Sequence, residues 1–346
     1  MSQACASGQP ASSLLTLIIT TSPTPSAPST ELISAILTSF RTHCRELLSC
    51  RVIVVFDTYE RIASQPRLKK GQVTPDGARC FSLYKQNIRE LILKEFGPYE
   101  NESSLHHGTG EAEFGYGGIE ANSVSFTTTQ SDDKRVTFIE PSKRLGFGLA
   151  VRSALRMTET PFVWVQQHDW SLVSDIPLGP LLDIIQATKA DASMPVKYVC
   201  FPSIRLLSYA DSAHVGQFSI LRTLTSTLKR NFVTESGATI LLTPMFFWHD
   251  KPHLASTEHY LSRVFPTRLS MLRGAFIEDT IGQRARNQMK EGEWAKWATW
   301  LYYPDEGQTL CLRHLRGRTW EGVEKESEKK AKWMAQNEKQ VATHSD

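Results

Sequence analysis

Two short apolar runs separated by a helical pattern constrain this chain most. Residues 14–20 (LLTLIIT) and 51–56 (RVIVVF) are rich in β-branched residues, which is typical of buried strands. Between them, from residue 31 to residue 48, apolar side chains recur at helical spacing. A strand, a helix and a strand in this order require parallel strands with a right-handed crossover. The sequence therefore predicts an α/β fold on a mostly parallel central sheet.

Further apolar runs extend this pattern toward the C-terminus. Residues 58–80 are polar and are expected to form a loop, whereas a helix containing Tyr84 and Ile88 should stop near Gly97. The glycine-rich stretch 97–125, which contains His106 and His107, is expected to be a flexible surface insertion. The other predicted elements are strands at 135–139, 162–165, 198–201 and 239–242, and helices up to 155, at 181–187 and at 275–290.

The 346 residues suffice for one large α/β domain. We expect a flexible tail over residues 1–13 and a single domain over residues 14–320. Residues 321–346 are rich in Glu and Lys four positions apart, which predicts a charged, solvated C-terminal helix.

Charge and composition disfavour several classes of protein. The 39 Lys and Arg residues against 36 Asp and Glu give a net charge of only +3, and no dense basic run is present, which disfavours a nucleic-acid surface. No apolar run approaches the roughly 20 residues of a membrane span. The six scattered cysteines are expected to be buried free thiols. The cytoplasm is the expected compartment, or the Golgi lumen if an anchor precedes this sequence.

Polar groups directly follow four of the predicted strands. They are Thr20-Thr21-Ser22, Asp57, the loop 143–148 and Asp169. Ligands of parallel sheets bind beyond the carboxyl ends of the strands. Four polar ends at one rim therefore predict a binding pocket there.

Five short motifs in this chain follow the order found in one family of enzymes. Each lies at the end of a predicted strand or at the start of a predicted helix. They are Ile18-Ile-Thr-Thr-Ser-Pro23, Val54-Val-Phe-Asp57, Lys143-Arg-Leu-Gly146, Gln167-His168-Asp169 and Phe276-Ile-Glu278-Asp279. Over about residues 14–320 the chain resembles the inverting GT-A glycosyltransferases of the large family that includes cellulose and chitin synthases.

The resemblance implies a fold, a reaction and a set of site residues. The fold is a three-layer αβα sandwich, with residues 14–175 as the nucleotide-sugar donor half and 176–320 as the acceptor and base half. The reaction moves a sugar, with a UDP-sugar favoured, to an acceptor hydroxyl with inversion. Asp169 would bind Mn²⁺ or Mg²⁺ at the leaving diphosphate. The remaining roles are donor binding by Thr20, Thr21, Ser22, Asp57, Arg144 and Gly146, and general base catalysis by Asp279 with Glu278 beside it.

The sequence departs from this family at Gln167, where an acid is expected. The metal would then be held mostly by substrate phosphates, or by an added ligand such as His314, since the family often has a late histidine near the metal. The departure also supports an alternative function, a catalytically inactive sugar-nucleotide-binding or scaffold protein.

Several other interpretations stay open for individual residues. Asp57 could be a turn residue, Glu278 and Asp279 could be ordinary charges at a helix start, and His168 is expected to have a structural, hydrogen-bonded role. The aromatic stretch 245–250 could form a sugar platform or part of the core.

Two other enzyme classes are weaker alternatives, and a zinc site is disfavoured. Nucleotidyl transfer would call for a glycine-rich loop after the first strand, where this chain has Ser, Thr and Pro. The Gly146-Phe-Gly148 pair fits the dinucleotide fingerprint of NAD(P) enzymes poorly. His249 and His253 resemble a zinc motif, but Pro252 would break the helix that this motif needs.

Overall fold

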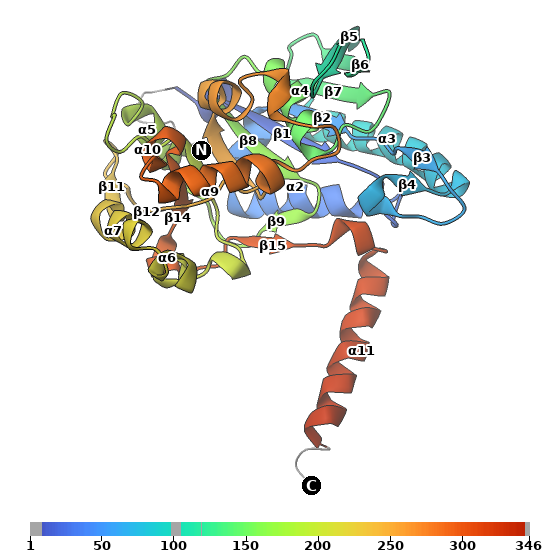
Figure 1. The fold of residues 1–346 in the computed structure, drawn as a ribbon. Coiled ribbons are helices and arrows are strands. Elements are labelled where there is room, and N and C mark those ends of the chain that lie inside the picture. The colour runs from blue at the N-terminus through green and yellow to red at the C-terminus, as the bar shows by residue number, and fades with distance from the viewer. Residues whose placement is uncertain (1–8, 98–104, 119, 343–346) are drawn as a thin grey trace.

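A sheet of eleven strands forms the centre of the molecule (Figure 1). The computed structural model describes residues 9–97, 105–118 and 120–342. The strands are β1 (Leu15–Thr21), β2 (Arg51–Phe56), β5 (Leu105–Glu113), β6 (Ser123–Ser131), β7 (Val136–Pro141), β8 (Phe162–Gln167), β10 (Tyr198–Cys200), β11 (Arg230–Val233), β12 (Thr239–Pro244), β13 (His253–Ser256) and β14 (Thr299–Tyr302). Their order is β11-β12-β14-β10-β13-β8-β1-β2-β7-β6-β5. Both halves of the chain therefore contribute to one sheet.

Most strands of this sheet run in the same direction. β8, β1, β2 and β7 form a parallel block in which Ile18 lies opposite Ile53 on one side and Val165 on the other. β6, β12 and β13 run against the remaining strands. All seven residues of β1 are buried, as its apolar sequence requires. The predicted α/β class with a mostly parallel sheet is confirmed.

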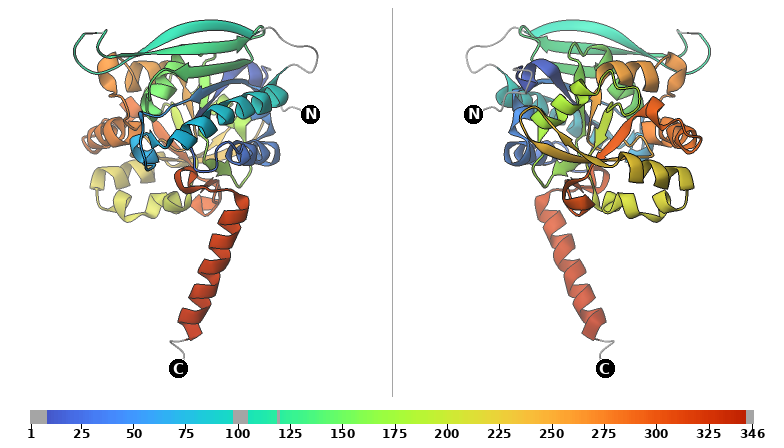
Figure 2. Two further views of the ribbon diagram at one scale, coloured as in Figure 1. Left: turned by 90° about the vertical axis from the view of Figure 1, so that its right-hand side faces the viewer. Right: turned by 90° about the vertical axis from the view of Figure 1, so that its left-hand side faces the viewer.

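Helices cover both faces of the parallel block (Figure 2). α2 (Glu31–His43) connects β1 to β2, and α3 (Pro75–Phe96) follows β2 and packs against β2 and β7. α4 (Phe147–Arg156) leads back from β7 to β8 and packs against β1 and β2. Because right-handed crossovers that step in opposite directions lie on opposite faces, α4 covers the face opposite to α2 and α3. The result is three layers, αβα.

Two segments predicted to be irregular are ordered elements. Residues 58–80 contain the short strands β3 (Arg61–Ile62) and β4 (Gln72–Val73), and α3 already begins at Pro75 because the Thr74 side chain accepts the Gly77 N–H. Within residues 97–125, the expected flexible insertion is wrong for 105–113, which form β5 of an antiparallel hairpin with β6. Its glycines and polar residues concealed the alternation of the strand. Residues 98–104 and 119 lie outside the described part.

Two helix boundaries differ from expectation, and three strands were not predicted. The helix predicted over 31–48 ends at His43, and a 3-10 helix, η1 (Arg45–Ser49), follows it. The helix expected from residue 275 begins as a π-helix, η7 (Glu278–Gly282), before α9 (Gln283–Lys290). Strands β11, β13 and β14 lie in segments for which no strand was predicted.

The two ends of the described chain differ in their packing. Ala11 is buried in a short helix, α1 (Ala11–Leu14), so the predicted loose tail does not extend to residue 13, and residues 1–8 lie outside the description. α11 (Val323–Ala342) projects from the body as the predicted charged helix (Figure 1). No helix in the described part of the chain has the length and apolar character to cross a membrane.

Candidate active site

A cavity of about 910 Å³ opens at the carboxyl ends of β1, β2 and β8. Every site residue predicted from the sequence contributes to its wall, although these residues come from both halves of the chain. They are Thr20, Thr21, Ser22, Asp57, Arg144, Gly146, Asp169, Glu278, Asp279 and His314. The structure thus brings together positions up to 294 residues apart.

Asp57 fixes the loop that precedes α4. Its carboxylate accepts the N–H groups of Leu145, at 2.6 Å, and of Gly146, at 3.0 Å. Burial raises the pKa of Asp57 to about 6, although these two N–H donors and the nearby Arg144 oppose the shift. Gly146 has a φ of +80° and lies against the backbone of Gly274. A Cβ atom on residue 146 would lie 2.5 Å from the Cα atom of Gly274. Asp57 therefore has a structural role at the cavity wall.

Asp169 and His314 meet through a small two-stranded sheet. β15 (Leu312–His314) pairs with β9 (Trp170–Leu172), which follows Asp169 directly. His314 Nε2 lies 3.2 Å from Asp169 Oδ2, and the Gly317 N–H donates to the same oxygen at 3.0 Å. Burial opposes ionisation of Asp169, but the His314 hydrogen bond, the charges of His168 and His314 and the Gly317 N–H lower its pKa to about 2. Asp169 is therefore an ionised carboxylate beside an imidazole.

His168 has the structural role expected from the sequence. Its Nδ1 accepts the Ser22 N–H at 3.2 Å and lies 3.0 Å from the Thr21 hydroxyl, which also contacts the Tyr84 hydroxyl at 2.7 Å. Burial lowers the pKa of His168, so the ring is neutral near pH 7. This histidine ties the loop after β1 to the end of β8.

The hydrogen bond of the Gln167 side chain explains why an amide, and not the expected acid, occupies this position. Its side-chain amide donates to the Asp250 backbone carbonyl at 2.8 Å. A carboxylate at this position would face a carbonyl oxygen with no proton between them. Gln167 thus joins β8 to the loop that precedes β13.

Glu278 and Asp250 form two reciprocal hydrogen bonds, in each of which the backbone N–H of one residue donates to the side-chain carboxyl group of the other. The Glu278 N–H donates to Asp250 Oδ1 at 3.3 Å, and the Asp250 N–H donates to Glu278 Oε2 at 3.4 Å. His249 Nδ1 lies 3.5 Å from the same Glu278 oxygen, and its hydrogen bond is the main cause that lowers the pKa of Glu278. Asp279, the next residue, is exposed and lines the cavity.

Asp250 was missed as a site residue in the sequence. It is 3% exposed, and its Oδ2 has no hydrogen-bond partner among the residues that the structure describes. Burial and the charge of Glu278 raise the pKa of Asp250 well above its usual range. Its only sequence signal was the aromatic stretch 245–250, whose Met245, Phe246 and Trp248 are fully buried. Met245, Phe246 and Trp248 therefore belong to the core, whereas Phe247 and His249 are partly exposed.

Seven basic side chains line the cavity without a carboxylate partner. Within the described ranges, none of them forms an ion pair of 4 Å or less. They are Lys69, Arg144, Arg205, Lys251, Arg313, Arg316 and Arg318. Sequence reasoning singled out Arg144, whereas most of the others come from distant segments without a common local pattern. Unpaired cations around one cavity attract an anionic ligand.

The cavity offers an incomplete set of metal ligands. Asp169 and His314 supply one carboxylate and one imidazole, both suited to a divalent cation such as Mn²⁺. Among the described residues, no group of three His, Cys, Asp or Glu side chains could hold a metal. His249 and His253 share no helix, because His253 begins β13 and its Nδ1 donates to the Lys251 carbonyl at 2.6 Å. A metal in the cavity would therefore need oxygen ligands from a bound substrate.

No protein-family model matches the chain, and no curated protein matches it in sequence. Several solved structures are similar to it at low identity. The structure of residues 1–349 of S. aureus TarS gives a TM-score of 0.42 at 11% identity, over 86% of this chain and 59% of TarS. The mannosyltransferase PcManGT from Pyrobaculum calidifontis, in complex with GDP-Man and Mn²⁺, gives 0.37 at 13% identity, over 85% and 58%. GalNAc-T7 with UDP, GalNAc and Mn²⁺ gives 0.41 at 7% identity, over 88% and 45%. The chain thus spans less than two thirds of each of these structures.

Proposed function

We propose that this protein is a glycosyltransferase that moves a sugar from a nucleoside-diphosphate sugar, preferably a UDP-sugar, to an acceptor hydroxyl with inversion. The observation that carries the proposal is the composition of one cavity. It combines unpaired cations with the ionised Asp169 beside His314, and with the carboxylates of Glu278 and Asp279. A diphosphate leaving group and a hydroxyl nucleophile need these two kinds of group together.

The donor would bind at the ends of β1, β2 and β8. Thr20, Thr21 and Ser22 would line the nucleotide subsite at the end of β1, and Asp57 and Gly146 would shape its wall. Guanidinium groups bind phosphate oxygens in a bidentate manner, and Arg144 lies in this part of the wall. Arg313, Arg316 and Arg318 add three more beside Asp169.

Asp169 and His314 would hold the divalent cation, with the diphosphate and water supplying its other ligands. The cation would neutralise the charge that develops on the departing diphosphate. Gly317 keeps the backbone of this segment close to Asp169. A Cβ at this position would lie 2.6 Å from His168 Nε2 and 2.9 Å from Asp169 Cβ. The ligand pair is thus held in place by the fold itself.

Asp279 would remove the proton from the acceptor hydroxyl. The acceptor oxygen forms a bond to the anomeric carbon as the bond from that carbon to the diphosphate breaks on the opposite face, which inverts the configuration. The proton goes to the Asp279 carboxylate, and the bonding electrons leave with the diphosphate. Glu278, held by His249 and by the Asp250 N–H, positions the start of the helix that carries Asp279.

A second candidate function is sugar-nucleotide binding without turnover. The structural use of Gln167 favours it, because the metal site has one carboxylate instead of two. The two functions differ in the predicted effect of Asp279, which matters for proton removal and not for donor binding.

A panel of nucleotide sugars, tested with Mn²⁺ for both binding and hydrolysis or transfer, separates the candidates. We expect UDP-sugars to raise the melting temperature of the wild type and to be turned over. Asp279→Ala should retain UDP binding and lose turnover, while the exposed Asp211→Ala, outside the cavity, should behave as wild type. Binding without turnover in the wild type would favour the scaffold function. If no nucleotide binds, both candidates are wrong.

A further inference from the structure

An ion pair outside the cavity lies directly beside Arg144. The Arg273 guanidinium binds the Glu60 carboxylate through both of its terminal nitrogens, at 2.7 and 3.0 Å. Nη1 of Arg273 also donates to the Arg144 carbonyl at 3.2 Å. Arg144 lines the cavity, whereas Glu60 and Arg273 do not. Arg273 therefore contacts a proposed phosphate-binding residue without lining the cavity itself.

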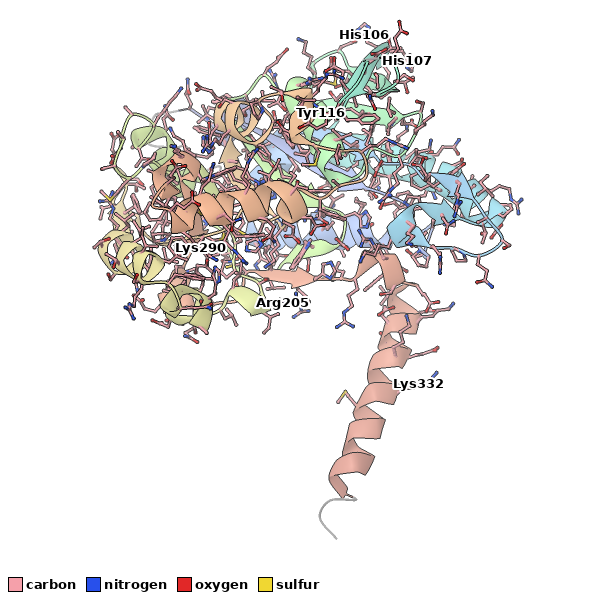
Figure 3. All side chains as sticks on the ribbon, in the orientation of Figure 1. His106, His107, Tyr116, Arg205, Lys290 and Lys332 are labelled. Carbon is pink, nitrogen blue, oxygen red and sulfur yellow. The ribbon has the colours of Figure 1, made fainter. Side chains whose placement is uncertain are left out.

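Arg273 joins three segments that are far apart in the sequence. Glu60 precedes β3 in the segment that contains β3 and β4, which lies on the side of the body away from β11 (Figures 1 and 3). Its backbone N–H donates to the Gly71 carbonyl at 2.7 Å, and the Arg144 side chain donates to the Lys69 carbonyl at 3.3 Å. Glu60 and Arg144 are thus both attached to the stretch just before β4, and Arg273 contacts both of them.

Glu60 and Arg144 lie close enough to pair with each other. A Cβ atom on residue 71 would lie 2.6 Å from Arg144 Cδ and 3.1 Å from Glu60 Cβ, so the two side chains approach the same point. Each charged group is connected to that point by a short, rotatable part of its side chain. Glu60 nevertheless binds Arg273, and Arg144 forms no ion pair of 4 Å or less with any residue that the structure describes. Arg273 therefore determines which arginine the Glu60 carboxylate neutralises.

A phosphate subsite needs Arg144 without a carboxylate partner. A guanidinium group binds phosphate oxygens in a bidentate manner, and a carboxylate would compete for the same N–H groups. The side chains of Arg273 and Glu60 are 30% and 39% exposed, so their ion pair should add little to the stability of the fold. The pair is thus better suited to controlling the charge beside Arg144 than to stabilising the protein.

From these contacts we infer that Arg273 is a positioning residue, which holds the Glu60 carboxylate away from Arg144 and keeps the Arg144 guanidinium free for the diphosphate of the donor. This inference rests on the proposed donor binding. Without Arg273, Glu60 would turn to Arg144 and compete with the phosphate. Arg273 thus acts on donor affinity from outside the cavity.

The test is a calorimetric titration of the full chain and its variants with UDP in the presence of Mn²⁺. Arg273→Gln should weaken UDP binding about tenfold or more, as expected for a lost charge-assisted hydrogen bond to phosphate. Glu60→Gln alone should bind UDP at least as tightly as the wild type, because it removes the carboxylate. The double variant Arg273→Gln/Glu60→Gln should recover the wild-type affinity, because no carboxylate is left to pair with Arg144.

Arg41→Gln is a matched control for this titration. It breaks another bidentate pair of an arginine and a glutamate, Arg41 and Glu95, which lies outside the cavity, and it should bind UDP as the wild type does. A loss of affinity in Arg273→Gln that Glu60→Gln does not restore would overturn the inference and indicate a purely structural role. UDP binding unchanged by Arg273→Gln rejects this inference alone, whereas the absence of UDP binding by the wild type rejects the proposed function with it.

Discussion

Two buried aspartates that line one cavity have pKa values shifted in opposite directions. Asp169 is 8% exposed and Asp250 is 3% exposed, so burial alone does not distinguish them. Asp169 lies beside His314 and accepts the Gly317 N–H, and its pKa falls to about 2. Asp250 is buried beside Glu278, and burial and the charge of Glu278 raise its pKa well above the usual range.

The comparison shows that neighbouring charge decides what a buried carboxyl group can do. An ionised carboxylate at the donor end suits a divalent cation. The Asp250 carboxyl group, whose pKa is raised, accepts the Glu278 N–H, and its tendency to hold a proton limits the negative charge beside the proposed base. The two aspartates thus differ because of their neighbours, although they are the same type of residue. Four predictions, based on three substitutions, test this contrast.

The largest effect is expected for Asp169→Asn. Loss of the carboxylate removes the ionised metal ligand, and we expect kcat/KM for UDP-sugar turnover to fall about 100- to 1000-fold, as for the loss of a strong electrostatic contact to the transition state. Steady-state kinetics with Mn²⁺ measures this. A fall of less than threefold would mean that Asp169 does not act on the leaving group.

Asp169 should also contribute to stability in a manner that depends on pH. Its pKa is about 2 in the folded protein and about 4 when exposed, so the unfolded chain binds the proton more tightly. The contribution is present above about pH 4 and is lost as the pH falls toward 2, with a magnitude of about 2 kcal/mol.

Urea denaturation of the wild type and Asp169→Asn between pH 7 and pH 2 measures this contribution. The difference between the two proteins should shrink as the pH falls. A difference that is constant across this range would show that Asp169 is not held ionised by its neighbours.

Gly317→Ala should loosen the ionised site with a smaller effect. The added methyl group would meet His168 and Asp169 and push away the amide that donates to Asp169. We expect a loss of about 1 kcal/mol in stability and a several-fold weaker UDP affinity in Mn²⁺. Gly179→Ala is a matched control, because the new Cβ meets nothing within 4 Å in helix α5 (Leu178–Ala187). Equal behaviour of the two variants would contradict a close contact at Gly317.

Asp250→Asn should have the smallest effect. The raised pKa of Asp250 favours its neutral form, and an amide replaces that form at nearly the same volume and still accepts the Glu278 N–H. Turnover at pH 7 should stay within about threefold of wild type, and the free energy of unfolding within about 1 kcal/mol. A hundredfold loss of turnover would show instead that Asp250 is ionised and takes part in proton transfer.

The positions of the side chains at the ends of β1, β2 and β8 follow more directly from the sequence than the contacts around Asp250 and Glu278, for a physical reason. β1, β2 and β8 are continuous apolar runs. The positions of their ends in the sequence predict that Thr20, Asp57 and Asp169 lie at one rim of the sheet. Parallel pairing makes such ends meet without further information. All predicted site residues at the ends of these strands therefore line one cavity.

The acceptor end depends on contacts that no local pattern encodes. Asp250 lies in a loop whose aromatic residues suggested a platform, yet its role comes from Glu278, 28 residues later. Arg205 and Arg318 reach the cavity from separate segments, and their lack of a counter-ion is a property of the folded chain alone. The π-helix at Glu278 and the β5–β6 hairpin were missed because polar and glycine-rich stretches hide the period of an element.

Calorimetric titration of UDP, with and without Mn²⁺, tests the central contrast most directly. In the wild type we expect Mn²⁺ to tighten UDP binding at least tenfold, because the ionised Asp169 and His314 share the metal with the diphosphate. In Asp169→Asn this gain should disappear, whereas Asp250→Asn should retain it. An equal gain from Mn²⁺ in wild type and Asp169→Asn, or no UDP binding by the wild type, would contradict the account.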